Sequence, residues 1–356
     1  AMAMEGLCIV ITPLVALMKD QVAGLRKRHI RAAALHAGMS HEEMLTTLDN
    51  CVFGFYKFLY VSPERLSSEL FIVKMRHSKV CFITVDEAHC ISQWGHDFRP
   101  SYLQIASLRR QIPSCPILAL TATATPQVAH DIQQTLMFKQ ENEFRMSFRR
   151  ENLAYQVLHA NNSMQGLQSV LETDTGSCII YRRSRQQCED LSHTLNEMGY
   201  TSTFFHAGLS YPEKDKRQTA WLHDQVRIMV ATNAFGMGID KPDVRLVVHL
   251  DIPDSIEEYF QEAGRAGRDG KPARSIIIID GREIENSKRR TAQRYPTVEY
   301  IRNTYEDICC YYQLAVGDGW HVTREFNMSQ FCHYFHYHPI MLSNALAILD
   351  NAGYIS

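Results

Sequence analysis

VCFITVDEAHCISQWGHDFRP, residues 80–100, is the stretch that decides the fold of this chain. Its first six residues, Val80–Val85, are mostly apolar and β-rich, which predicts a strand buried on both faces of a parallel sheet. Asp86 and Glu87 follow directly. Ligands of open α/β sheets bind beyond the carboxyl ends of the strands, where two adjacent acids suit Mg²⁺ held through water and the activation of an attacking water. A bare pair of acids is also typical of a solvated turn.

The loop after the acids carries two aromatic residues and an arginine, Trp94, Phe98 and Arg99. Such side chains pack against their own protein in many loops, but they are also the groups that stack on nucleobases. The loop therefore indicates nucleic acid as a candidate ligand.

Length and composition set limits on the class of protein. A chain of 356 residues predicts about two or three domains. Its formal charge of −2 requires that any nucleic-acid site be a local basic groove. Ten cysteines without a paired CxxC framework favour reduced thiols, mostly in the core of a cytosolic protein. No apolar run is long enough to predict a membrane span.

Strand and helix patterns alternate along the first half of the chain, which predicts a parallel sheet with helices on both faces. A helix is expected at 14–28, and another after Ser40, which suits an N-cap with Glu42 and Glu43 in the first turn. The other expected strands are 6–12, 32–35, 57–61 and 117–120.

The second half repeats the plan of the first. His36-Ala37-Gly38 and His206-Ala207-Gly208 lie 170 residues apart. Each is followed 26 residues later by a hydroxyl residue that ends a strand, Ser62 in one half and Thr232 in the other. Two landmarks at one spacing predict tandem domains of the same architecture, with a boundary near 147–153. The expected domains are 1–148, 149–282 and a helical region, 283–356, whose end resembles the front of a winged helix, with a strand starting near 353–355.

Two segments of the second half carry candidate site residues. QEAGRAGRDG, residues 261–270, is expected to begin as a helix with Arg265 and Arg268 on one face, although a solvated basic turn is the plain alternative. Two arginines opposite two carboxylates across a cleft suit phosphoryl transfer. MVATNAFGMGIDKPDVR, residues 229–245, is either a nucleotide- and strand-contacting loop or an ordinary Gly-rich connector. Its candidate residues are Thr232, Asn233, Gly238 and Asp240.

Seven segments together resemble the RecQ-type DNA helicases of helicase superfamily 2. They follow the family order over about residues 6–280, and CISQWGHDFRP separates this group from RNA helicases better than DEAH does. The segments are ITPLVALMKDQV (11–22), YVSPERL (60–66), TVDEAHCISQWGHDFRPSY (84–102), LALTATAT (118–125), IIYRRSRQQCEDL (179–191), ATNAFGMGIDKPDVR (231–245) and YFQEAGRAGRDG (259–270).

The resemblance implies two tandem RecA-like domains that use ATP and Mg²⁺ to unwind DNA in repair or recombination. Asp86 would hold Mg²⁺ through water, Glu87 would activate the attacking water, and His89 would link the nucleotide site to neighbouring motifs. From the second domain the phosphates would be reached by Gln261, Arg265 and Arg268, with Arg268 the preferred arginine finger. Trp94, Phe98 and Arg99 would sense single-stranded DNA. The rest of the strand channel would be lined by Pro13, Ser62, Arg65, Arg182, Ser184, Thr232 and Asn233.

Two departures from the family accompany the resemblance. The chain contains no glycine-rich loop followed by Lys-Ser or Lys-Thr, the element that cradles nucleotide phosphates. We therefore expect the first domain to be incomplete at its N-terminus and this chain to hydrolyse ATP poorly. Cys309, Cys310 and Cys332 do not give the spacing of the family's zinc module, so no bound zinc is expected. The alternatives left open are an RNA or duplex translocase of the same superfamily and a non-catalytic nucleic-acid-binding protein.

Overall fold

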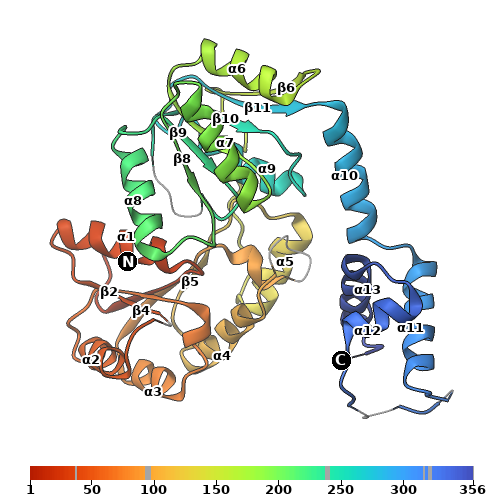
Figure 1. Ribbon diagram of the computed structural model, residues 1–356. Coiled ribbons are helices and arrows are strands. Elements are labelled where there is room, and N and C mark those ends of the chain that lie inside the picture. The colour runs from red at the N-terminus through yellow and green to blue at the C-terminus, as the bar shows by residue number, and fades with distance from the viewer. Residues whose placement is uncertain (37, 93–97, 237–240, 316, 320–322, 356) are drawn as a thin grey trace. The chain divides into compact units, whose positions relative to one another are not determined.

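The computed structural model describes residues 1–36, 38–92, 98–236, 241–315, 317–319 and 323–355 (Figure 1). Strands and helices alternate through the first part of the chain, as the sequence predicts. The elements there are β1 (Leu7–Ile11), α1 (Val15–Lys27), β2 (Ala32–Leu35), α2 (His41–Val52), β3 (Phe58–Val61), α3 (Glu69–His77), β4 (Val80–Val85), α4 (Gln104–Gln111), β5 (Ile117–Ala119) and α5 (Pro126–Thr135).

The first sheet has the strand order β2-β3-β1-β4-β5, and all its pairs are parallel. Helix α1 covers one face through Met18 and Val22, whereas the larger core with α2 to α5 lies on the other. The prediction of helices on both faces is therefore confirmed. Within β4, buried and half-buried residues alternate. The prediction that this strand is buried on both faces is therefore wrong, because one face is only half-buried.

The register brings the ends of these strands into one row. Val85 pairs with Ile11 on one side and with Ala119 on the other, and Ile11 in turn pairs with Val61. Because the strands are parallel, the residues that follow each of them meet at the same edge of the sheet. Asp86 lies on that edge after β4, between the ends of β1 and β5.

The second sheet is built from β6 to β11, in the order β6-β11-β10-β7-β9-β8. Its described pairs among β7 to β10 are parallel. The elements of this part are β6 (Leu153–His159), α6 (Ser163–Thr173), β7 (Ser177–Tyr181), α7 (Arg185–Glu197), β8 (Ser202–Phe205), α8 (Tyr211–Leu222), β9 (Ile228–Ala231), β10 (Val244–His249), α9 (Ile256–Ala263) and β11 (Ala273–Ile279).

The internal repeat is confirmed by matching backbone hydrogen bonds. The Ser62 N–H donates to Leu35 O at 3.1 Å, and 170 residues later the Thr232 N–H donates to Phe205 O at 3.2 Å. Likewise, Thr12 N–H donates to Val61 O and Arg182 N–H to Ala231 O. The predicted helix cap at Ser40 is also present, because its hydroxyl accepts from the Glu43 N–H while the Glu43 carboxylate accepts from the Ser40 N–H.

The last part of the chain is helical: α10 (Gly281–Arg294), α11 (Val298–Tyr311), α12 (Met328–Phe335) and α13 (Pro339–Asn351). Ile308, Phe331, Leu342 and Leu349 form its core. The strand expected near 353–355 is wrong, since the N–H groups of Gly353 and Tyr354 turn back onto the carbonyls of Asp350 and Leu349 at the end of α13. Among the described residues, no helix is long and apolar enough to span a bilayer.

Candidate active site

The acidic pair lies where β4 ends. Asp86 Oδ2 accepts a 3.3 Å hydrogen bond from the Thr12 hydroxyl, which follows the neighbouring strand β1. Its other oxygen accepts from the Glu87 N–H at 3.0 Å, and the Tyr102 hydroxyl donates to the Asp86 carbonyl at 3.0 Å. The carboxylate is thus held from two strands. Thr12 and Tyr102 were missed by sequence reasoning, because neither stands out until the register places it beside Asp86.

Glu87 has a strained backbone. Its φ of 48° and ψ of 45° place it in the left-handed region, which costs a residue with a side chain on the order of 1–3 kcal/mol. A 3-10 helix, Ala88–Ile91, begins directly after it. Strain of this kind is retained where the surroundings fix a functional geometry. The turn gives the two adjacent carboxylates separate environments.

His89 connects the acids to a second strand end. It is only 2% exposed, and its Nδ1 lies 3.0 Å from Thr121 Oγ1, beyond β5, and 3.5 Å from Glu87 Oε2. The Ala88 N–H also donates to Leu120 O at 2.9 Å. In the structure Thr121 contacts His89, and the cap of α5 is the hydroxyl of Thr125.

The chemistry of Asp86 fits a magnesium ion. Burial raises the pKa of this carboxyl, while hydrogen bonds from the Glu87 N–H and the Thr12 hydroxyl oppose the rise. The described residues hold no cluster of three or more His, Cys, Asp or Glu side chains suited to a metal ion. Mg²⁺ commonly binds through one or two carboxylates, waters and substrate phosphates rather than in an all-protein cage. A single carboxylate at the strand end suits that mode.

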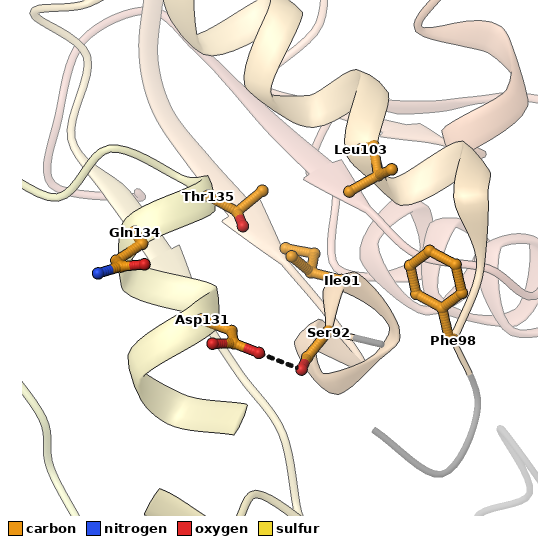
Figure 2. Close-up of a pocket in the computed structure, with 7 residues that line it drawn as sticks. All are labelled: Ile91, Ser92, Phe98, Leu103, Asp131, Gln134 and Thr135. Atoms are coloured by element: carbon orange, nitrogen blue, oxygen red, sulfur yellow. Dashed lines mark hydrogen bonds between the residues drawn. The ribbon is translucent and has the colours of Figure 1, made fainter. Parts of the chain in front are cut away.

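The aromatic-rich loop is joined to the acids by its backbone. The Arg99 N–H donates to Cys90 O in the 3-10 helix at 2.9 Å. Phe98 lines a pocket of about 240 Å³ together with Ile91, Ser92, Leu103, Asp131, Gln134 and Thr135. Figure 2 shows Phe98 and Leu103 opposite the three residues from α5, with the 2.6 Å bond from Ser92 to Asp131 beneath. Trp94 lies outside the described residues.

In the second domain, the prediction that a helix carries Arg265 and Arg268 is wrong. Helix α9 ends at Ala263, with Gln261 in its last turn. Gly264 ends the helix, and Gly267 has a φ of +61°, so the glycines turn the chain instead of continuing the helix. Arg265 is 8% exposed and donates to the Gly236 carbonyl, whereas Arg268 is exposed.

Two residues from the interdomain boundary hold the turn before Arg268. Arg150 donates to the Gly264 carbonyl at 2.9 Å and also to the Gly267 carbonyl. Asn152 Nδ2 donates to the Gly267 carbonyl at 2.7 Å and to the Lys271 carbonyl at 2.8 Å. Sequence reasoning treated this polar segment only as a boundary. Nothing in the sequence pattern pairs it with a turn more than a hundred residues away.

The residues predicted to line a strand channel all follow the carboxyl ends of parallel strands. Ser62 is buried, and its hydroxyl has no hydrogen-bond partner among the described residues. Ser184 caps α7 through a capping box with Gln187, and Asn233 donates to Glu258 at 3.1 Å. Gly238 and Asp240 lie outside the described residues. The remaining members are Pro13 after β1, Arg65 after β3, Arg182 after β7 and Thr232 after β9.

Two family models match the chain. The model "DEAD/DEAH box helicase" matches residues 2–132, and the model "Helicase conserved C-terminal domain" matches residues 161–270. The chain is 42% identical over 281 residues to "ATP-dependent DNA helicase RecQ" of Haemophilus influenzae, covering 79% of this chain and 45% of that protein. The protein of the same name from Bacillus subtilis is 41% identical over 286 residues, covering 80% and 48%. The chain therefore spans about half the length of these curated relatives.

Solved structures agree on the fold. Saccharomyces cerevisiae Dbp5, in a structure described as bound to RNA and ADP BeF3, superposes with a TM-score of 0.60 at 17% identity, over 81% of this chain and 75% of that one. Helicase Lhr of Mycobacterium smegmatis, described as bound to ssDNA and AMP-PNP, also gives 0.60, at 19% identity over 78% and 40%. The tandem parallel-sheet architecture predicted from the sequence is thus confirmed.

Proposed function

The chain belongs to the RecQ family of superfamily 2 helicases, and on that premise we propose that its two sheet domains form an ATP-dependent motor that unwinds duplex DNA by moving along one strand. One observation carries the proposal. The chain that leaves the aromatic-rich loop is hydrogen-bonded to the DEAH segment at two points, from the Arg99 N–H to Cys90 O and from the Tyr102 hydroxyl to Asp86 O. A DNA strand that displaces this loop therefore also moves the backbone of the DEAH segment.

In this proposal each acid has its own task. Asp86 would hold Mg²⁺ through water, and the bound ion would neutralise charge on the phosphates. Glu87 accepts the proton of the attacking water, and His89 transmits the state of the acids to Thr121. From the second domain, Gln261 and Arg268 reach the phosphates, with Gly238 and Asp240 beside the nucleotide. We assign a structural role to Arg265, because its buried guanidinium donates to the Gly236 carbonyl.

The DNA would run across the carboxyl ends of the β-strands in both domains. Because these positions are mainly hydroxyls, amides and arginines, we propose that they contact phosphates, while the aromatic loop contacts bases. The unpartnered Ser62 hydroxyl supports such a contact, since a buried hydroxyl without a partner is costly unless a ligand satisfies it. The proposed path consists of Pro13, Ser62, Arg65, Trp94, Phe98, Arg99, Arg182, Ser184, Thr232 and Asn233.

Phosphate release and strand separation together test this function. Both are measured with matched single-stranded and forked DNA and RNA, for this chain and for the complete protein encoded by its gene. DNA-stimulated phosphate release with unwinding of the DNA fork by the complete protein is the expected result. Stimulation by RNA alone would instead favour an RNA translocase, and nucleic-acid binding without phosphate release would favour a non-catalytic binding protein.

Replacing Phe98 with alanine is expected to weaken single-stranded DNA binding by about 1–3 kcal/mol, the usual contribution of one base stacked on an aromatic ring. Fluorescence anisotropy of a labelled oligonucleotide measures the change. Phe53→Ala is the matched control, because that ring is 83% exposed and is not on the proposed path. Equal affinity of the Phe98→Ala variant and the parent would remove Phe98 from the path.

The limits of the domains and the cellular setting are also proposals. We place the domain limits at 148/149 and 282/283, which leaves each sheet in one domain. Family membership supports a role in DNA repair or recombination, in the cytoplasm and, if the source is bacterial, at the nucleoid.

A further inference from the structure

A buried polar cluster lies beneath the second-domain turn and is not used by the mechanism above. His249, the last residue of β10, is 1% exposed, and Glu262, in the last turn of α9, is 6% exposed. His249 Nε2 lies 2.9 Å from Glu262 Oε2. The imidazole stacks on Tyr181, with ring centroids 5.2 Å apart, and meets the edge of Tyr259 at 5.0 Å. Buried groups of this kind are costly unless they are paired.

Arg265 connects the cluster to the loop residues Phe235 and Gly236, which follow β9. Its guanidinium donates to the Gly236 carbonyl, and a Cβ at Gly236, where φ is +147°, would lie 2.3 Å from Arg265 Cζ. The loop backbone therefore rests directly on the guanidinium. The Tyr181 hydroxyl donates to the adjacent Phe235 carbonyl at 3.0 Å. Two side chains of the cluster thus fix two successive carbonyls of the loop.

Charge explains why Glu262 belongs to this arrangement. The buried guanidinium of Arg265 needs a nearby negative charge, because an unpaired buried charge is strongly unfavourable. Burial raises the pKa of Glu262, and the hydrogen bond from His249 and the positive charge of Arg265 oppose that rise, while Glu258 adds to it. His249 Nε2 orients the carboxylate at 2.9 Å, and the Arg265 N–H donates to the Glu262 carbonyl at 3.3 Å, which places the two residues side by side.

We propose that His249 and Glu262 are positioning residues that hold the Arg265 guanidinium against the Gly236 carbonyl, and so fix both residues 233–236 and the turn before Arg268. The catalytic consequence rests on the proposed function, because it is Arg268 that would reach the phosphates. If these residues only packed the core, a variant would lower turnover only in proportion to the loss of folded protein. A positioning role predicts that a variant lowers the turnover of the protein that remains folded, whereas a packing role predicts that this turnover is unchanged.

The test combines amide exchange with steady-state kinetics. Hydrogen–deuterium exchange of the peptide covering 229–236 is followed in this chain without ligands, for the parent, Glu262→Gln, Glu262→Ala and the control Glu257→Gln, which lies in the first turn of the same helix. ATP turnover and KM are measured with single-stranded DNA in the complete protein. Glutamine keeps the shape and an oxygen acceptor for His249 but removes the negative charge, so it remains informative where alanine fails to fold.

We expect exchange in the 229–236 peptide to rise in both Glu262 variants, more in alanine than in glutamine, and to stay unchanged in Glu257→Gln. Turnover should fall about 10- to 100-fold in Glu262→Ala, the scale of a small misplacement of catalytic groups, with KM for ATP within about twofold and partial rescue by glutamine. Unchanged exchange, or a loss of turnover that only follows the folded fraction, would overturn the proposal. Absence of turnover in the parent would overturn the proposed function, while exchange alone would still decide the positioning role.

Discussion

Replacing Arg268 with alanine is expected to reduce DNA-stimulated ATP turnover by about 10³- to 10⁵-fold, the contribution of an arginine that neutralises charge in phosphoryl transfer. Arg268 is the exposed arginine of its turn, whereas Arg265 is buried and bonded to Gly236. The turn itself is held by Arg150 and Asn152 through backbone carbonyls. Removing the Arg268 side chain therefore leaves the supports of the turn in place. Phosphate release by the complete protein, at saturating ATP and single-stranded DNA, measures the effect.

Two controls make this result specific. Lys271→Ala removes an exposed cation three residues further along and should leave turnover unchanged. Arg268→Lys keeps the charge but loses the planar fork of the guanidinium, so it should recover only part of the activity. If Arg268→Ala turned over at nearly the parental rate while Arg265→Ala was inactive, Arg265 would be the residue that reaches the phosphates. The melting temperature of each variant separates loss of chemistry from loss of fold.

Replacing Glu87 with glutamine is expected to lower turnover by about 10²- to 10⁴-fold, the usual contribution of a positioned general base. Glutamine keeps the size of the side chain and leaves the backbone turn at φ 48° unchanged. It removes the carboxylate that would accept the proton of water. Binding of ATP should persist, because Asp86 and its partners Thr12 and Tyr102 are untouched. Single-turnover phosphate release, together with binding of a fluorescent ATP analogue, measures both effects.

Glu42→Gln is the matched control for Glu87→Gln. Glu42 lies on the exposed first turn of α2, so the same chemical change there should leave turnover at the parental value. Asp86→Asn tests the other half of the site and should raise the Mg²⁺ concentration needed for activity. Parental turnover in Glu87→Gln would contradict its role as the base.

Local patterns were enough to predict the strands of the first sheet and the helices α1 and α2. Val80–Val85, Ala32–Leu35 and the Ser40 cap follow from side-chain periodicity and from a short-range hydrogen bond, and both are properties of neighbouring residues. The repeat was visible as well, because spacing along the chain reports equal supersecondary units. Sequence reasoning failed where a glycine ends an element, after Ala263 in α9, and where the tail turns back onto α13 at Gly353. In both places the chain leaves the pattern through backbone turns that side-chain periodicity does not encode.

By itself, the sequence determined the family, the two parallel sheets and the position of Asp86 and Glu87 at the end of a strand. It did so because residue type and spacing act locally, and because seven motifs in order leave few other folds. The tertiary structure alone decided which side chains meet: Thr12 with Asp86, His89 with Thr121, and Arg150 with the turn before Arg268. It also distinguished the buried Arg265 from the exposed Arg268. These contacts join residues up to 117 positions apart, and only strand register and burial bring such distant groups within hydrogen-bonding distance.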